Sequence, residues 1–208
     1  CKATGRKIVF VECNAIAPNT MREITGILQA AGCTVVDAGI VGPPPRNGAK
    51  QRFYVSGPQA ELMNRINSEQ IQVRVAGEKI GDASAVKMCY AALTKGTTAL
   101  GTELLIAARK LGVDKVLENE FKGSQADRYE SLLKGTAGMP FKAYRWVPEM
   151  NEIAKTFEGA GMTPKIYQGA AELYAQIATT PQGKESPEEA RAKKRSPTDV
   201  INGLADTI

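Results

Sequence analysis

The stretch Gly81–Leu111, GDASAVKMCYAALTKGTTALGTELLIAARKL, decides how the rest of this sequence is understood. It predicts one helix of about 30 residues, with Gly81 or Asp82 as N-cap and Gly112 at the left-handed position after its end. Apolar residues recur at spacings of three, four and seven, which predicts an apolar stripe made of Val86, Cys89, Leu93, Leu100, Leu104 and Leu111. Its many alanines and glycines let other backbones approach closely, so we expect a central, buried helix.

Lys87 lies off this predicted stripe and is the candidate for chemistry. Its neighbours one and two turns away are Ser84, Tyr90, Ala91 and Thr94, a small and polar surface with room for a ligand. On pattern alone, a solvated lysine on a helix surface is the alternative interpretation, and both stay open at this point.

Upstream of this helix, strands and helices alternate in the order typical of an α/β sheet. Strands are predicted at 7–13, 34–38, 52–56 and 71–75, and helices at 20–31 and 58–68. The run KIVFVEC at 7–13 is continuously apolar, which is typical of a fully buried parallel strand. Irregular structure is expected over Gly39–Gly48, because three prolines and three glycines disfavour regular structure there.

Beyond residue 80 the strand pattern stops. Helices are predicted at 114–122, 125–137, 141–160, 165–179, 186–194 and 198–206. We therefore predict two domains: a partial α/β domain over 1–80 and a helical domain over 81–208, which the long helix of about 82–111 opens.

The amino-acid composition argues against several classes of function. The 208 residues are 43% hydrophobic, enough for a sizeable core, and no apolar run approaches the ~20 residues of a membrane span. The net charge is +5, but acidic residues in the same segment balance the basic run Arg191–Arg195, so we expect no nucleic-acid partner. A dispersed positive surplus suits anionic small molecules. Because the chain starts at Cys1 and almost directly on a strand, we expect a fragment of a longer protein.

The sequence contains no histidine. This removes histidine-based triads and the common catalytic zinc sites, so a general acid or base must be Lys, Tyr, Cys, Asp or Glu. The cysteines Cys1, Cys13, Cys33 and Cys89 show no C-x-x-C spacing. We expect reduced thiols in a cytoplasmic protein, and no metal site.

The dinucleotide fingerprint G-x-G-x-x-G after a strand is absent from this sequence. Gly159–Gly161 ends a helix, and Gly96–Gly101 has the P-loop spacing without its lysine. GIVGPPP at 39–45 directly follows a strand, and strand ends are where ligands bind in open α/β sheets. Its glycines would let backbone amides approach an anion. A rigid proline-rich connector is the alternative on pattern alone.

Four stretches together resemble the β-hydroxyacid dehydrogenase / 6-phosphogluconate dehydrogenase superfamily: DAGIVGPPP (37–45), YVSGPQAE (54–61), GDASAVKMCYAALTKG (81–96) and RWVPEMNEIAKTF (145–157). They are more similar to its branch with a C-terminal helical domain of unknown function. The resemblance implies the second half of a Rossmann-like NAD(P)-binding domain, followed by a 6-phosphogluconate dehydrogenase C-terminal-like helical domain. The usual first half, with its fingerprint, would lie upstream of Cys1.

The resemblance also implies roles for individual residues. The catalytic lysine of the family corresponds to Lys87, with Tyr90 and Ala91 in place of its two asparagines. Cofactor contacts fall on Asn14 and Ala15. Substrate contacts fall on Val41, Gly42, Tyr90, Ala91 and Thr94.

What the resemblance implies is an NAD(P)-dependent dehydrogenase or reductase, with NADP or NAD as cofactor. Hydride would pass to or from a secondary alcohol or carbonyl, of the β-hydroxyacid kind, with Lys87 as general acid/base. We expect this fragment to be inactive alone. The alternatives are imine reductase-like activity, or a non-catalytic helical dimerisation fragment. The expected partners are a small-molecule substrate and a second copy in a homodimer, without nucleic acid or membrane.

Overall fold

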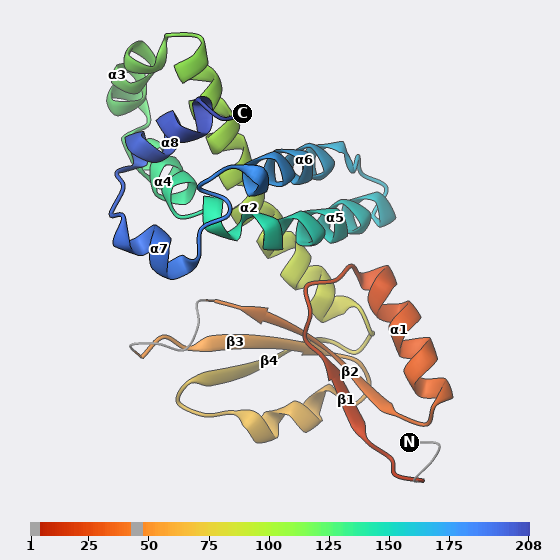
Figure 1. The fold of residues 1–208 in the computed structure, drawn as a ribbon. Helices are drawn as coiled ribbons and strands as arrows, with labels where there is room; N and C mark the ends of the chain where they lie inside the picture. Colours follow the sequence, from red (N-terminus) through yellow and green to blue (C-terminus); the bar gives the residue numbers. More distant parts are fainter. Residues whose placement is uncertain (1–4, 43–47) are drawn as a thin grey trace. The chain divides into compact units, whose positions relative to one another are not determined.

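The computed structural model describes residues 5–42 and 48–208, and the chain forms two compact units (Figure 1). The first unit comprises residues 1–91 and 152–164, and the second comprises 92–151 and 165–208. Helix α2 (Asp82–Lys110) begins in the first unit and ends in the second, whereas α5 (Ala143–Gly159) begins in the second and ends in the first. The domain boundary predicted after residue 80 stays a prediction. Cys1 and the predicted proline-rich segment 43–45 lie outside the described residues.

The first unit is built on a four-stranded sheet of order β1-β2-β3-β4. Its strands are β1 (Val9–Glu12), β2 (Thr34–Val41), β3 (Gln51–Ser56) and β4 (Ile71–Gly77). β1 runs parallel to β2 and β3 parallel to β4, whereas β2 and β3 are antiparallel. Helix α1 (Pro18–Ala30) lies against β2, and the 3₁₀ helix η1 (Ala60–Ile66), predicted as an ordinary helix, lies against β3 and β4.

Two strand predictions need correction. β2 continues through Val41 into the segment predicted to be irregular, because its backbone pairs with β3 as far as Arg52. β1 was predicted to be fully buried, yet Val9 is 50% exposed. β1 is an edge strand, and within the described residues no further strand pairs with its outer side.

The two faces of the sheet have different roles. Val36, Ala38, Val55, Ala60 and Met63 form the apolar core on the side of η1. Successive side chains of a strand point to opposite faces. Asp37, Gly39 and Val41 therefore face the other side, where α2 begins.

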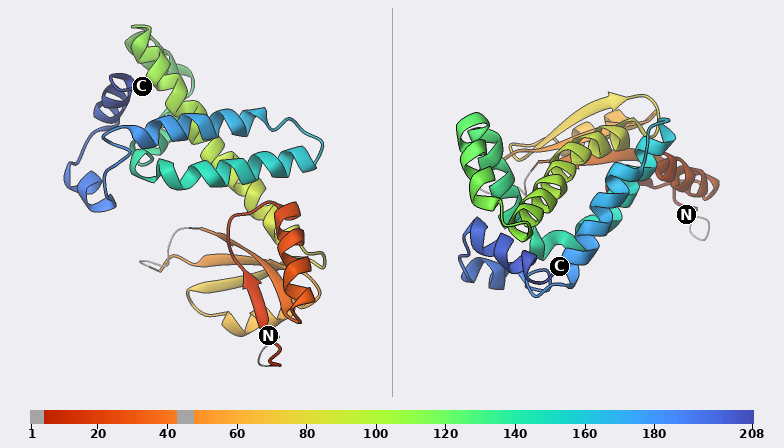
Figure 2. Two further views of the ribbon diagram at one scale, coloured as in Figure 1. Left: turned by 45° about the vertical axis from the view of Figure 1, so that its right-hand side comes forward. Right: turned by 90° about the horizontal axis from the view of Figure 1, so that it is seen from above.

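The second unit is helical and confirms the helices predicted beyond residue 111. Besides the later parts of α2 and the start of α5, it contains α3 (Asp114–Ser124), α4 (Ala126–Ala137), the 3₁₀ helix η2 (Pro140–Lys142), α6 (Lys165–Thr179), α7 (Pro187–Ala192) and α8 (Pro197–Ala205). Leu105, Tyr129 and Ile201 form a core where α2, α4 and α8 meet. Figures 1 and 2 show α5 beside α6, where the rings of Trp146 and Tyr174 meet edge to face at 5.2 Å.

The predicted apolar stripe of α2 is not its buried face. Leu93, Leu100 and Leu111 are 66–75% exposed, whereas the buried positions include five alanines together with Met88, Leu105 and Ile106. Small residues pack because neighbouring helices come close: a Cβ on Gly101 would lie 2.6 Å from Leu132 Cδ2. Within the described residues, no helix combines the length and apolar character needed to cross a membrane.

Candidate active site

The start of α2 is held by a buried carboxylate from the sheet. Asp37 is fully buried on β2, and its Oδ2 accepts hydrogen bonds from the Gly81 and Ser84 backbone N–H groups at 2.9 and 3.1 Å. Its other donors are the hydroxyls of Ser56, at 2.8 Å, and Ser84, at 2.7 Å. Because the first N–H groups of a helix have no intrahelical partner, Asp37 acts as the cap of α2 and fixes its first turn to β2.

Lys87 follows this first turn and packs on the same strand. A Cβ built on Gly39 would lie 2.8 Å from Lys87 Cβ and 2.9 Å from the Ala83 carbonyl oxygen. The helix therefore touches the strand where the strand has no side chain. Lys87 is half-buried, so its stem is fixed at the sheet and is not a fully solvated side chain.

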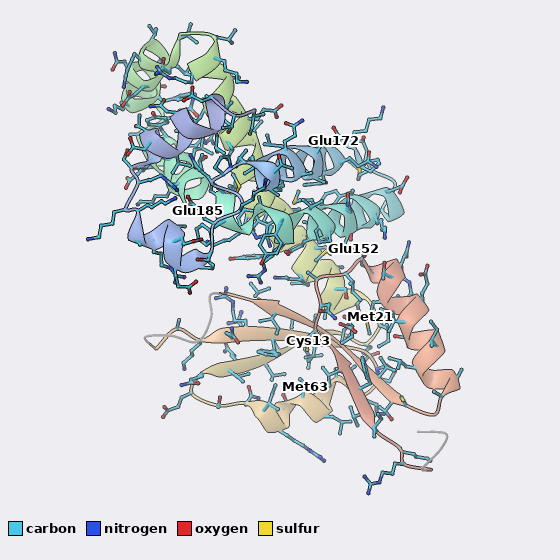
Figure 3. All side chains as sticks on the ribbon, viewed as in Figure 1. Cys13, Met21, Met63, Glu152, Glu172 and Glu185 are labelled. Atoms are coloured by element: carbon cyan, nitrogen blue, oxygen red, sulfur yellow. The ribbon has the colours of Figure 1, made fainter. Side chains whose placement is uncertain are left out.

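The end of β1 carries a second buried carboxylate. Glu12 is 8% exposed and lies opposite Asp37 in the sheet. Its Oε1 accepts from the Asn14 backbone N–H at 2.8 Å and from Asn14 Nδ2 at 2.5 Å. Burial, together with the carboxylates of Glu12 and Asp37, raises the pKa of the Cys13 thiol, which Figure 3 labels. Cys13 is therefore a neutral thiol at pH 7 and a poor nucleophile.

The predicted cofactor and strand residues lie at two neighbouring strand ends. Asn14 is exposed and Ala15 is partly buried, both just beyond β1. Val41 is 2% exposed as the last residue of β2. Gly42 follows it, exposed and with φ of +118°, a backbone conformation that favours glycine.

The predicted substrate residues of α2 are divided between the units. Tyr90 is 46% exposed and Ala91 is 1% exposed, both in the first unit with Lys87. Thr94 is exposed and belongs to the second unit. The first unit thus brings Lys87 to β2, which ends at Val41, directly before Gly42.

Sequence reasoning missed the structural roles of Asp37, Ser56 and Ser84. Ser84 was expected on the ligand-facing surface, but it is 2% exposed and bonded to Asp37. A signal was present in TVVDA, because an acidic residue inside an apolar strand must find partners when it is buried. Their identity has no local signal: Asp37 and Ser84 are 47 positions apart.

Comparisons with known proteins agree with this architecture. Residues 108–177 match the model of a domain of unknown function, DUF1932. An uncharacterised 28.5 kDa protein of Methanothermus fervidus, encoded in the 7S RNA 5′ region, is 25% identical over 173 residues, which cover 82% of this chain and 66% of that protein.

Two solved structures share the fold. A conserved hypothetical protein from Sinorhizobium meliloti 1021 is 25% identical with a TM-score of 0.71, over 96% of this chain and 66% of that one. A conserved protein of unknown function with structural similarity to 3-hydroxyacid dehydrogenases is 27% identical with a TM-score of 0.64, over 90% of this chain and 68% of that one.

The fold is therefore that of the 3-hydroxyacid dehydrogenases: an α/β sheet of Rossmann type followed by a helical domain, as predicted. These likenesses support the assignment to the β-hydroxyacid dehydrogenase superfamily, and more particularly to proteins whose helical part carries DUF1932. The chain spans 66% of the length of the relatives from M. fervidus and S. meliloti.

Proposed function

We propose that this chain is part of an NAD(P)-dependent dehydrogenase that transfers hydride to or from a secondary alcohol or carbonyl of the β-hydroxyacid kind. The observation that carries the proposal is the position of Lys87. Its stem lies against Gly39 of β2. It follows by about one turn the start of α2, which Asp37 caps. A half-buried lysine whose stem lies on β2, two residues before the strand ends, suits proton transfer to a bound substrate. The nicotinamide cofactor supplies the redox chemistry.

The described residues fit the reactive end of such a cofactor. Asn14 donates its Nδ2 to Glu12, which turns its amide oxygen away from that carboxylate. That oxygen suits the carboxamide amino group of a nicotinamide, and the small side chain of Ala15 leaves room beside it. The start of α1 does not suit a phosphate, because the carboxylate of Glu152 already binds the Ala17 N–H at 2.8 Å.

We therefore propose that the pyrophosphate contacts come from a part of the complete protein outside these 208 residues. Two facts support this part of the proposal. The relatives are longer than this chain. In addition, Val9 at the start of β1 and Ile8 just before it are 50% and 46% exposed, which suits an edge against which further strands pair.

The role proposed for Lys87 is that of general acid/base. As the neutral amine it takes the hydroxyl proton during oxidation, and as the ammonium it protonates the carbonyl oxygen during reduction. The backbone N–H of Gly42, at the exposed end of β2, is the proposed donor to the substrate.

Replacing Lys87 by methionine in the complete protein tests this role. We expect Lys87→Met to lower kcat by about 10²–10⁴-fold, the usual contribution of a positioned acid/base, while the affinity for NADP⁺ is kept. Lys79→Met, eight positions upstream at an exposed residue, is the matched control and should retain activity. Wild-type turnover in Lys87→Met would remove this lysine from the mechanism.

The substrate panel for this assay contains β-hydroxyacids, ketones and cyclic imines. Turnover of imines alone would favour the imine reductase alternative. No turnover of any member, with either NAD or NADP, would favour a non-catalytic helical module.

We also propose that two copies associate through the second unit. Leu93 and Leu100 on α2 and Ile166 on α6 are 66–72% exposed. Leu93 and Leu100 lie between hollows of about 540 Å³ and about 320 Å³. Large apolar side chains that are exposed close together are typical of surfaces through which proteins associate.

A further inference from the structure

A basic cavity in the second unit shares no residue with the Lys87 site. It has a volume of about 340 Å³ and is formed by the end of α4, η2, the segment before α7, α7 itself and the start of α8. Pro140, Phe141 and Val200 supply apolar wall, and Arg191, Lys194 and Arg195 supply three cations. These cations come from the basic run Arg191–Arg195, whose charge is balanced along the sequence but not around this cavity.

The one carboxylate of the lining, Glu185, is already paired with two cations of its own. Glu185, labelled in Figure 3, accepts hydrogen bonds from both terminal nitrogens of Arg195, that from Nη1 at 2.8 Å, and from Lys193 Nζ at 2.6 Å. The Arg195 hydrogen bonds, with further help from Lys193, lower the pKa of Glu185 to about 2. Glu185 therefore stays ionised and paired with its own partners, and Arg191 and Lys194 leave the cavity positive.

Like charges are crowded at its rim. Lys142 Nζ lies 4.9 Å from the centre of the Phe141 ring. Burial first, and then the charges of Arg191 and Arg145, lower the pKa of Lys142. An anion bound between these cations would relieve their mutual repulsion.

A second, independent feature of this cavity is Gln182, whose side-chain amide indicates a ligand with a hydrogen-bond donor. This lining residue is 8% exposed, and its Nε2 donates to the Val200 carbonyl oxygen at 3.3 Å. That bond fixes the orientation of the amide, because the flipped amide would set two oxygens against each other. The opposite atom, Oε1, is buried without a hydrogen-bond partner among the described residues. A buried acceptor without a partner is unfavourable, so a ligand that brings a hydrogen-bond donor to it is favoured.

The backbone is also unusual at this cavity. Lys194 has φ of +45°, and within the described residues it is the one non-glycine residue with positive φ. A side chain is strained in this region. The turn it makes between α7 and α8 sets Lys194 and Arg195 at the cavity.

We propose that this cavity binds a small organic phosphate that carries a hydroxyl group. The phosphoryl group lies on Arg191 and Lys194, and the carbon skeleton contacts Phe141. The hydroxyl donates to Gln182 Oε1, which is fully covered in this structure and becomes accessible when the amide turns toward the ligand. Cationic side chains with several N–H donors are the usual partners of phosphate. The volume is at the lower end of small-molecule sites, which suits a ligand of about the size of a pentose phosphate.

Calorimetric titration of the full 208-residue chain with ribose 5-phosphate, inorganic phosphate and ribose tests the proposal. We expect saturable binding of ribose 5-phosphate, weaker binding of inorganic phosphate, and none of ribose. Arg191→Gln should weaken the binding of ribose 5-phosphate by tenfold or more, because it removes a charge-assisted hydrogen bond to the phosphate. The matched control is Arg128→Gln on α4, an exposed arginine outside the cavity, and it should not change the affinity.

The variant Gln182→Leu distinguishes a specific binding site from a surface that is merely basic. It should weaken ribose 5-phosphate about 5–10-fold, the value of one hydrogen bond, and leave inorganic phosphate unchanged. Circular dichroism checks folding, and Lys194→Gln replaces Arg191→Gln if the latter is unfolded. No saturation by ribose 5-phosphate at about 10 mM, or equal losses in Arg191→Gln and Arg128→Gln, would overturn the proposal.

Discussion

Gly39 sets how closely α2 approaches β2, and with it the position of Lys87. Since a methyl group there would lie 2.8–2.9 Å from Lys87 Cβ and the Ala83 carbonyl oxygen, Gly39→Ala must push the helix start away from the sheet. We expect the free energy of unfolding to fall by about 1–3 kcal/mol, the usual cost of overpacking. Urea unfolding of the purified chain measures it.

Gly26→Ala is the control at the same residue scale. Gly26 lies within α1, is exposed, and would meet no atom within 4 Å. Alanine is the better helix former there, so this variant should be unchanged or more stable by about 0.5–1 kcal/mol. Equal stabilities of the two variants would show that α2 does not depend on the missing side chain at Gly39.

At the scale of elements, α1 depends on a cap from a distant helix. Ala17 at its N-cap offers no side-chain acceptor, and Glu152 of α5 supplies one: Oε2 accepts from the Ala17 N–H at 2.8 Å and Thr20 Oγ1 at 2.9 Å. Glu152→Ala should lower the free energy of unfolding by about 0.5–2 kcal/mol. Glu158→Ala, at an exposed position of the same helix, is the control expected to be neutral.

The effect of Glu152→Ala should depend on pH. Burial alone would raise the pKa of Glu152, but donors from Ala17, Lys155 and Thr20 lower it below its ordinary value. A carboxylate with a lowered folded-state pKa stabilises the fold above its unfolded-state pKa, and this contribution is lost as pH falls through the folded-state value. The stability gap between wild type and Glu152→Ala should therefore close in acid. A gap that stays constant down to pH 2 would indicate lost packing instead.

Sequence pattern predicted which elements form but not which faces pack. The expected helix at 82–111 is α2 at Asp82–Lys110, because its ends are marked by glycine and by loss of periodicity. Periodicity shows that Leu93 and Leu100 share a face, but not that the opposite, alanine-rich face is the packed one. Likewise, no local signal links Glu152 to Ala17, 135 positions away. The family pattern predicts Lys87 as the site lysine, and its role stays a prediction. The hydrogen bonds of Asp37 that hold the start of α2 could not be predicted, because they join residues far apart in the sequence.

At the scale of the whole molecule, cofactor affinity tests where the pyrophosphate contacts lie. If they lie outside this 208-residue chain, as proposed, the chain should bind NADP⁺ no better than about 1 mM, because it offers only Asn14 and its neighbours. Isothermal titration against the complete protein makes the comparison. Nanomolar binding to the 208-residue chain would refute the proposed division of the cofactor site.

Association is the other property of the whole molecule, and a single charge can test it. Leu93 is 72% exposed on α2, beside both apolar hollows, whereas Val116 on α3 is 74% exposed and lies outside them. Leu93→Lys places an unpaired charge in the proposed interface and should raise the dimer dissociation constant by tenfold or more, since desolvating a charge costs more than one apolar contact contributes. Val116→Lys adds the same charge at an equally exposed site and should leave it unchanged. Sedimentation velocity over a concentration series reads out both. A chain that is monomeric at every concentration, or a dimer that tolerates Leu93→Lys as well as Val116→Lys, would show that this face of α2 is not where the copies meet.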